Sequence, residues 1–114
     1  MKKIVPLLLT PALAGLATAA WGYSELTKFE LKEVTVPLLK PGTLRGDKEF
    51  KILHISDLHM IPGQEEKIEW VSALPDLEPD LVVNTGDNLS DVAGVPDVLR
   101  AIGPLMRYRG LFVF

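Results

Sequence analysis

Two stretches decide the fold of this chain: KILHISDLH at residues 51–59 and LVVNTGDN at residues 81–88. Each begins with apolar, β-forming residues and continues into a polar segment that contains an aspartate. Between them, residues 64–74 place apolar side chains on one face of a predicted helix, which Pro75 stops. A strand, a helix and a second strand in this order predict a βαβ unit whose two strands are parallel.

The same alternation continues toward residue 114. It predicts three strands, at residues 50–55, 81–83 and 111–114. A helix is predicted from Val95, with a break or kink at Gly103 and Pro104. Its expected apolar face comprises Val98, Leu99, Ile102, Leu105 and Met106. The second strand is wholly apolar, which is typical of a parallel strand covered on both faces. We therefore predict an α/β fold with a parallel βαβαβ sheet over residues 49–114.

Residues 1–24 are interpreted as a hydrophobic helix that targets a membrane. Lys2 and Lys3 precede an uncharged run of 21 residues, 4–24, of which 14 are apolar. At ~1.5 Å per residue this run reaches ~31 Å, enough to cross a hydrocarbon core. Two alternatives stay open: a single-pass anchor in the cell membrane, or a signal peptide cleaved near the small residues 17–20, giving a secreted domain. In both, the lysines place the rest of the chain outside the cytoplasm.

Residues 25–48 are predicted to form a strand and a linker. The segment 29–36 is rich in β-forming residues, but its apolar alternation slips at Glu33. This pattern indicates a bulged strand or an edge strand. Prolines and glycines then interrupt a polar connection that ends near Lys48.

The composition excludes several classes of protein. The 114 residues carry 12 Lys and Arg against 15 Asp and Glu, a formal charge of −3, and no cysteine. Disulfide scaffolds and thiolate metal sites are therefore excluded. Basic and acidic residues are interspersed, without the basic stripe of a nucleic-acid binder, so no nucleic-acid partner is expected.

Three candidate metal ligands follow the first two predicted strands. Asp57 and His59 are two residues apart, so in extended backbone their side chains leave the same face, with Cα atoms about 6.6 to 7 Å apart. Asp87 follows Asp57 by 30 residues, about the length of one βαβ unit, which predicts it at the same sheet edge. Gly86 fits a tight turn beside a ligand. One carboxylate can bridge two metal ions about 3.5 to 4 Å apart, as in two-metal phosphoryl chemistry.

Two neighbouring polar residues have other interpretations. Asn88 either orients a metal-bound water as a second layer around the site or merely stabilises the turn, and the sequence leaves both open. His54 lies an odd number of positions from Asp57, on the opposite face of the strand. We therefore expect His54 to be a packed core histidine rather than a ligand.

At these motifs the sequence resembles the calcineurin-like metallophosphoesterase family, specifically its membrane-anchored bacterial members. The resemblance rests on strand-Asp-x-His followed by Gly-Asp, and it runs from about Lys51 to Phe114. It implies part of a metallophosphoesterase-type sheet sandwich and metal-dependent hydrolysis of a phosphoester substrate. By resemblance, Asp57 and His59 hold the first metal and Asp87 bridges both. The implied cofactors are divalent ions, two in the complete enzyme, and oxygen and imidazole ligands favour Mn, Fe or Zn.

The family pattern continues with a Gly-Asn-His-Asp or Gly-Asn-His-Glu motif, a lone His and Gly-His-x-His, and none of these occurs in this sequence. We therefore expect the chain to be the N-terminal portion of a phosphoesterase, with at most half a site and no activity alone. The alternative is a non-catalytic, membrane-tethered remnant, or a module whose last strand, residues 110–114, docks a partner polypeptide.

Overall fold

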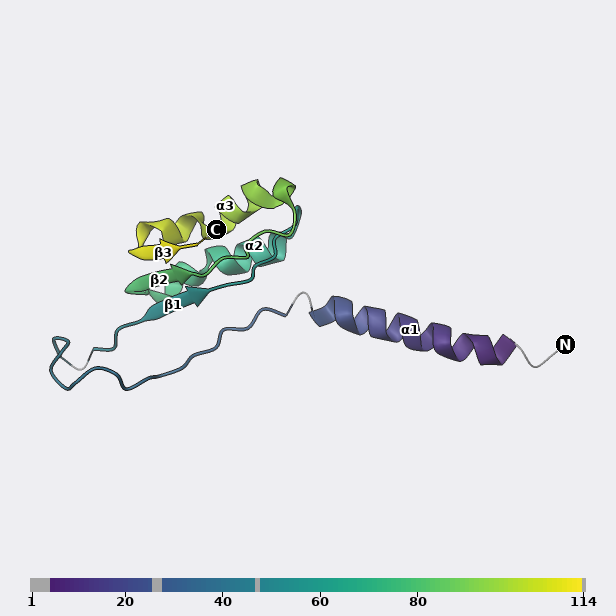
Figure 1. The fold of residues 1–114 in the computed structure, drawn as a ribbon, viewed down its shortest axis with the longest axis horizontal. Coiled ribbons are helices and arrows are strands. Elements are labelled where there is room, and N and C mark those ends of the chain that lie inside the picture. Colours follow the sequence, from purple (N-terminus) through teal and green to yellow (C-terminus); the bar gives the residue numbers. More distant parts are fainter. Residues whose placement is uncertain (1–4, 26–27, 47, 114) are drawn as a thin grey trace. The chain divides into compact units, whose positions relative to one another are not determined.

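The computed structural model describes the backbone of residues 5–25, 28–46 and 48–113, and side chains from residue 13 onward. The chain divides into two compact units between Lys32 and Glu33, and each is described by itself. The first unit contains one helix, α1 (Val5–Glu25), where the sequence predicted a helix (Figure 1). Lys2 and Lys3 lie outside the described residues. Among the residues described, no helix combines the length and the apolar character needed to cross a membrane.

The second unit contains a parallel three-stranded sheet in the order β1-β2-β3 (Figure 1). Helices and 3₁₀ turns alternate with the strands, which confirms the predicted α/β architecture over this part of the chain. The elements are β1 (Ile52–Ile55), α2 (Glu65–Ser72), η1 (Leu74–Leu77), β2 (Leu81–Asn84), η2 (Val92–Gly94), α3 (Val95–Ile102), η3 (Gly103–Arg107) and β3 (Gly110–Phe112).

The predicted strand over residues 29–36 is not formed. Residues 28–38 have no regular secondary structure, and the described sheet consists of β1, β2 and β3 alone. A β-rich sequence becomes a strand only when a neighbour completes its backbone hydrogen bonds. The propensity of this segment is therefore not sufficient by itself.

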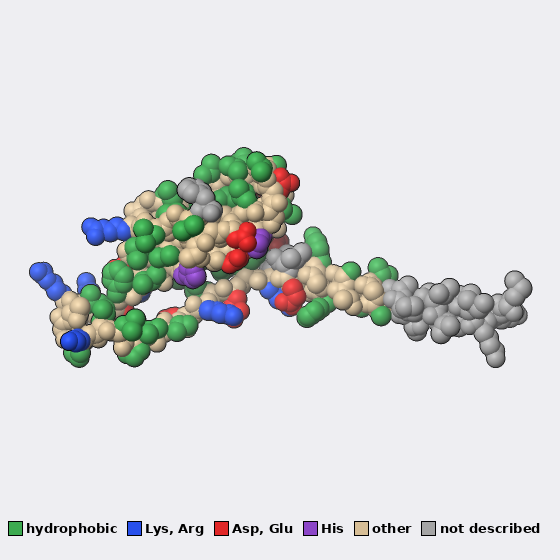
Figure 2. Space-filling model, viewed as in Figure 1, with side chains coloured by type: hydrophobic (Ala, Val, Ile, Leu, Met, Phe, Trp, Pro, Cys, Tyr) green, Lys and Arg blue, Asp and Glu red, His purple; other side chains and the backbone are tan. Residues whose placement is uncertain are grey.

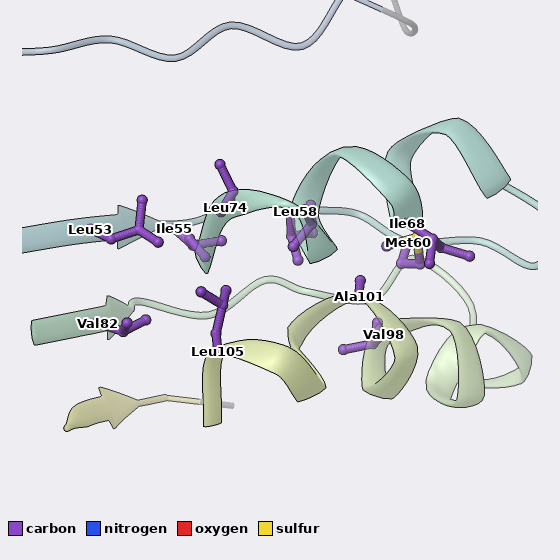
Figure 3. Packing of buried hydrophobic residues seen from close by; sticks show 11 residues of the cluster. Leu53, Ile55, Leu58, Met60, Ile68, Leu74, Val82, Val98, Ala101 and Leu105 are labelled. Carbon is purple, nitrogen blue, oxygen red and sulfur yellow. The ribbon is translucent and has the colours of Figure 1, made fainter. Parts of the chain in front are cut away.

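One hydrophobic core lies between the sheet and the helices (Figure 3). Helices α2 and α3 each turn one apolar stripe toward it, as helical spacing predicts. Its buried members are Leu53, Ile55, Leu58, Met60, Ile68, Val71, Leu74, Val82, Val98, Ala101 and Leu105. The buried strand residues are alternate ones, so they all belong to one face of the sheet.

Within the second unit, the described residues leave the other face of the sheet uncovered, which corrects the expectation that β2 is covered on both sides. Ile52 and Leu111 are exposed, and Val83 is only partly buried. Because the strands follow one another in order, two crossovers of the same hand place both helices on the same side of the sheet. The apolar sequence of β2 was therefore not sufficient to predict that both of its faces are covered.

The apolar face predicted from Val95 onward is only partly correct. Val98 and Leu105 are buried, whereas Leu99 and Met106 are exposed. The α-helix ends at Ile102 and continues as the 3₁₀ segment η3 at Gly103 and Pro104, where the break was predicted. A 3₁₀ turn has about 3.0 residues per turn instead of 3.6, so the helical phase shifts and Met106 turns outward.

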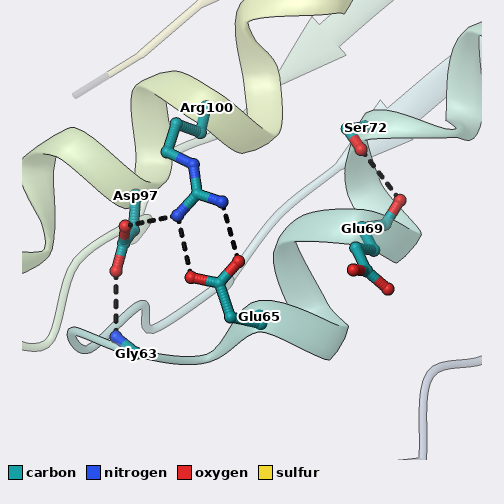
Figure 4. Close-up of polar contacts among 6 residues, drawn as sticks. All are labelled: Gly63, Glu65, Glu69, Ser72, Asp97 and Arg100. Atoms are coloured by element: carbon teal, nitrogen blue, oxygen red, sulfur yellow. Dashed lines mark hydrogen bonds and ion pairs between the residues drawn. The ribbon is translucent and has the colours of Figure 1, made fainter.

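Polar side chains join the start of α2 to α3 (Figure 4). The guanidinium of Arg100 donates two hydrogen bonds to the carboxylate of Glu65, at 2.9 and 2.7 Å. Asp97 accepts from Arg100 at 3.2 Å and from the backbone N–H of Gly63 at 2.9 Å. This network connects both helices to the turn that leads out of the first polar loop.

Candidate metal centre

The polar segments that follow β1 and β2 run side by side and extend the parallel ladder beyond the strands. Met60 and Leu89 form an isolated parallel bridge. Five backbone N–H groups donate across this pair of loops: Thr85 to Ile55 (3.1 Å), Asp57 to Gly86 (3.0 Å), His59 to Asp87 (3.1 Å), Met60 to Asn88 (2.8 Å) and Ser90 to Met60 (3.0 Å). The two loops therefore form one hydrogen-bonded unit at the carboxyl edge of the sheet.

The three predicted ligands all have left-handed backbone conformations. The φ angles are 54° at Asp57, 44° at His59 and 54° at Asp87, and Gly86 has φ 99°. The expectation of extended backbone between Asp57 and His59 is therefore wrong. Such conformations cost about 1 to 3 kcal/mol each outside glycine, and they persist only where the surroundings fix them. Here the bonds between the two loops supply that constraint.

The ligand atoms of these three side chains converge at the surface. His59 Nε2 lies 3.4 Å from Asp87 Oδ2 and 3.9 Å from Asp57 Oδ1. One ligand atom from each residue lies within 4.8 Å of the other two. Figure 2 shows acidic side chains next to a histidine on the exposed surface of this unit. The side chains are 53 to 64% exposed, so an ion and a solute can reach them.

This donor set fits a divalent cation. Imidazole nitrogen and carboxylate oxygen lie about 2.0 to 2.2 Å from Zn²⁺, so two ligands of one ion are separated by about 3 to 3.5 Å. The separation between His59 and Asp87 falls in this range, and Asp57 lies slightly farther away. Without thiolates, the set also suits Mn²⁺ or Fe. Ser56 Oγ donates a hydrogen bond to Asp57 Oδ2, leaving Oδ1 facing His59.

Asn84 shapes the second loop, a role that was not predicted from the sequence. Its side chain is fully buried. Its Oδ1 accepts from the N–H of Gly86 at 2.9 Å, and its Nδ2 donates to Asn88 Oδ1 at 3.0 Å. The contact made by Asn88 supports the turn-stabilising interpretation of that residue. The signal for Asn84 was a polar residue at a core-facing position of an apolar strand, the same face as Val82.

The contact that Lys67 makes near the site was also not predicted from the sequence. From helix α2 the Nζ of Lys67 donates to the carbonyl oxygen of Leu58 at 2.9 Å. Leu58 stands between the candidate ligands Asp57 and His59 in the sequence. Partial burial lowers the pKa of the Lys67 ammonium below its ordinary value, because the charged form loses solvation. The lysine follows two glutamates at the start of α2, where the sequence suggests only a solvated face.

His54 is not a core histidine. It is exposed on the uncovered face of β1, with its Nε2 2.8 Å from Thr85 Oγ1. The expectation of packing was wrong because both helices of the second unit cover the opposite side of the sheet.

Comparison with known protein families identifies the class. Residues 50–113 match the family model described as calcineurin-like phosphoesterase, which covers more than half of the chain. The chain therefore belongs to the calcineurin-like phosphoesterase family, whose members use divalent metals. No curated protein and no solved structure matched the chain. The matched range includes both polar loops and all three candidate ligands.

Proposed function

We propose that this domain binds divalent metal ions for the hydrolysis of a phosphoester, with Asp57, His59 and Asp87 as ligands. The observation that carries the proposal is the convergence of three ligand atoms within 4.8 Å at the ends of two neighbouring strands. Asp57 and His59 would hold the first ion, and Asp87 would be a ligand shared with a second ion. Mn²⁺, Fe and Zn²⁺ are the candidates.

A divalent ion supplies Lewis acidity and lowers the pKa of water toward ~7, which provides a nucleophile at neutral pH. The residues of this chain fix the geometry. Ser56 holds one oxygen of Asp57, and Asn84 holds the turn that carries Asp87. The exposure of the three ligand side chains leaves space for a phosphoester.

The test is Mn²⁺-dependent hydrolysis of an aryl phosphate by a chain that carries the later family motifs. Asp87→Asn keeps the size of the side chain but removes its charge, and we expect it to abolish turnover. Asp91→Asn is the matched control, because Asp91 accepts the N–H of Ala93 as a helix cap and asparagine caps equally well. Equal activity of the Asp87→Asn variant would remove Asp87 from the site.

The second candidate function is metal binding without hydrolysis. Among the described residues, only one group of three ligand-type side chains converges, which is enough for one ion. This alternative predicts that the 114-residue chain binds Mn²⁺ and has no turnover. Measuring Mn²⁺ binding and turnover on the same protein then separates binding from catalysis.

We also propose that the hydrophobic N-terminal segment places the domain at the cell membrane, outside the cytoplasm. The support is the uncharged run of residues 4–24 after Lys2 and Lys3. Protease added to intact cells should digest the domain, whereas protection until lysis would contradict this location. A phosphoester, and no nucleic acid, is the proposed partner.

A further inference from the structure

The peptide group between Leu58 and His59 is held at both ends. Its carbonyl oxygen accepts a hydrogen bond from Lys67 Nζ at 2.9 Å. Its N–H, which belongs to His59, donates to the carbonyl oxygen of Asp87 at 3.1 Å. Because a peptide group is planar, these two bonds fix its orientation. That orientation contributes directly to the φ angle of His59.

The orientation of this peptide decides where the imidazole lies. His59 has φ 44°, a conformation that only a few per cent of residues other than glycine adopt, although asparagine, aspartate and histidine adopt it more often than the rest. Rotation of the peptide plane would let His59 return to negative φ and move its ring away from Asp87 Oδ2. Leu58, the residue before His59, has its side chain buried in the core, so its backbone cannot follow that rotation freely.

We propose that Lys67 is a positioning residue that holds His59 in its ligand geometry by bonding the Leu58 carbonyl. The inference rests on the proposed metal site and assigns Lys67 no contact with metal or substrate. Two observations carry it: Lys67 turns inward from α2 and is partly buried, and the carbonyl it contacts lies between two ligands that both have positive φ. Its effect is therefore on the arrangement of ligands before the ion arrives.

Lys51 provides a matched comparison within the chain. Its Nζ also donates to a backbone carbonyl oxygen, that of Leu77, at 3.4 Å. This contact lies just before β1, whereas the candidate ligands follow the carboxyl end of that strand. Variants at both positions therefore lose a bond from a lysine to a backbone carbonyl. Only the variants of Lys67 should also change the position of His59.

The experiment compares Lys67→Met, Lys67→Arg and Lys51→Met with the unaltered full chain. Methionine keeps the aliphatic stem and removes the donor, and arginine retains a donor. We expect Lys67→Met to weaken Mn²⁺ binding in calorimetry by about 10-fold, the lower end of what outer partners of metal ligands contribute. Lys67→Arg should recover most of that affinity, and Lys51→Met should bind as the unaltered chain does.

A second measurement, on metal-free protein, tests the role of Lys67 independently of metal binding. The amide-to-Hα coupling of His59 reports its φ angle, and we expect it to change in Lys67→Met but not in Lys51→Met. An unchanged coupling together with unchanged Mn²⁺ affinity would overturn the role of Lys67. Absence of Mn²⁺ binding by the unaltered chain would instead overturn the proposed function, and the coupling would still decide whether Lys67 positions His59.

Discussion

His59 Nε2 lies 3.4 Å from Asp87 Oδ2, although the two residues follow different strands of the sheet. The backbone reinforces this side-chain contact, because the N–H of His59 donates to the carbonyl oxygen of Asp87 at 3.1 Å. The two residues are thus joined twice. This double connection explains how an exposed site retains a defined geometry.

The left-handed conformation of His59 predicts an unusual order of stability among variants. Alanine normally stabilises a protein relative to glycine, because glycine loses more backbone entropy on folding. At φ 44° the order should reverse, with His59→Gly more stable than His59→Ala by roughly 1 kcal/mol. Chemical denaturation of metal-free protein measures the difference. A more stable alanine variant would show that His59 leaves this conformation in solution.

Removal of the Asn84 side chain should destabilise the domain. Asn84→Leu keeps the branched shape of the side chain but removes the acceptor for the buried Gly86 N–H, and an unpaired buried group costs about 1 to 3 kcal/mol. Asn88→Ala removes the other partner of Asn84 and should cost less, because Asn88 is partly exposed. Denaturant midpoints of both variants test this order. Equal midpoints for Asn84→Leu and the unaltered chain would contradict it.

The ion pair between α2 and α3 predicts a specific dependence on acid. The hydrogen bond from Arg100 lowers the pKa of the Glu65 carboxyl below its ordinary value of 4.5. A lowered pKa stabilises the folded state above pH 4.5, and this contribution is lost as the pH falls through the lowered value. Glu65→Gln should therefore slightly lower the Tm at pH 7, and the difference should vanish in strong acid.

Glu66→Gln is the control for the ion pair, since Glu66 lies in the same first turn of α2. Like Glu65, Glu66 interacts with the dipole of the helix, but it does not accept the two hydrogen bonds from Arg100. A pH-independent difference between Glu65→Gln and the unaltered chain would contradict the prediction.

The uncovered face of the sheet predicts self-association of the 114-residue chain. Leu111 on this face is 67% exposed, and Ile52 lies on the same side. Val83 of β2 lies beside Leu111 on this face and is only partly buried, and an apolar surface of this kind favours association in water. Leu111→Lys should shift sedimentation toward the monomer. Leu99→Lys, at a position on α3 that is 62% exposed, should change it less; an equal effect at both positions would contradict a role for this face.

Local sequence patterns were sufficient for the elements and for the edge where the site forms. Apolar runs and turn residues located β1, β2 and β3, because each is bounded by polar or glycine-containing segments. They also located Asp57, His59 and Asp87, since parallel strands end at a common edge. The strand predicted at residues 29–36 failed because pairing depends on a neighbour that local propensity does not reveal.

The parts that were not predicted depend on tertiary contacts. The positive φ angles at the ligands follow from the hydrogen bonds between two loops, which residue spacing does not encode. Lys67 bonds a carbonyl nine residues earlier in the chain, and a lysine on a helix carries no local mark of that contact. The exposure of His54 and Leu99 likewise depends on which surfaces the helices cover.

The most direct test is calorimetric titration of the metal-free chain with Mn²⁺, alongside Asp87→Asn and Asp91→Asn. We predict saturable binding to the unaltered chain and to Asp91→Asn, and at least about 100-fold weaker binding to Asp87→Asn, because a direct ligand contributes no less than its outer partners do. Equal binding by all three proteins, or binding by none, would contradict a metal centre formed by Asp57, His59 and Asp87.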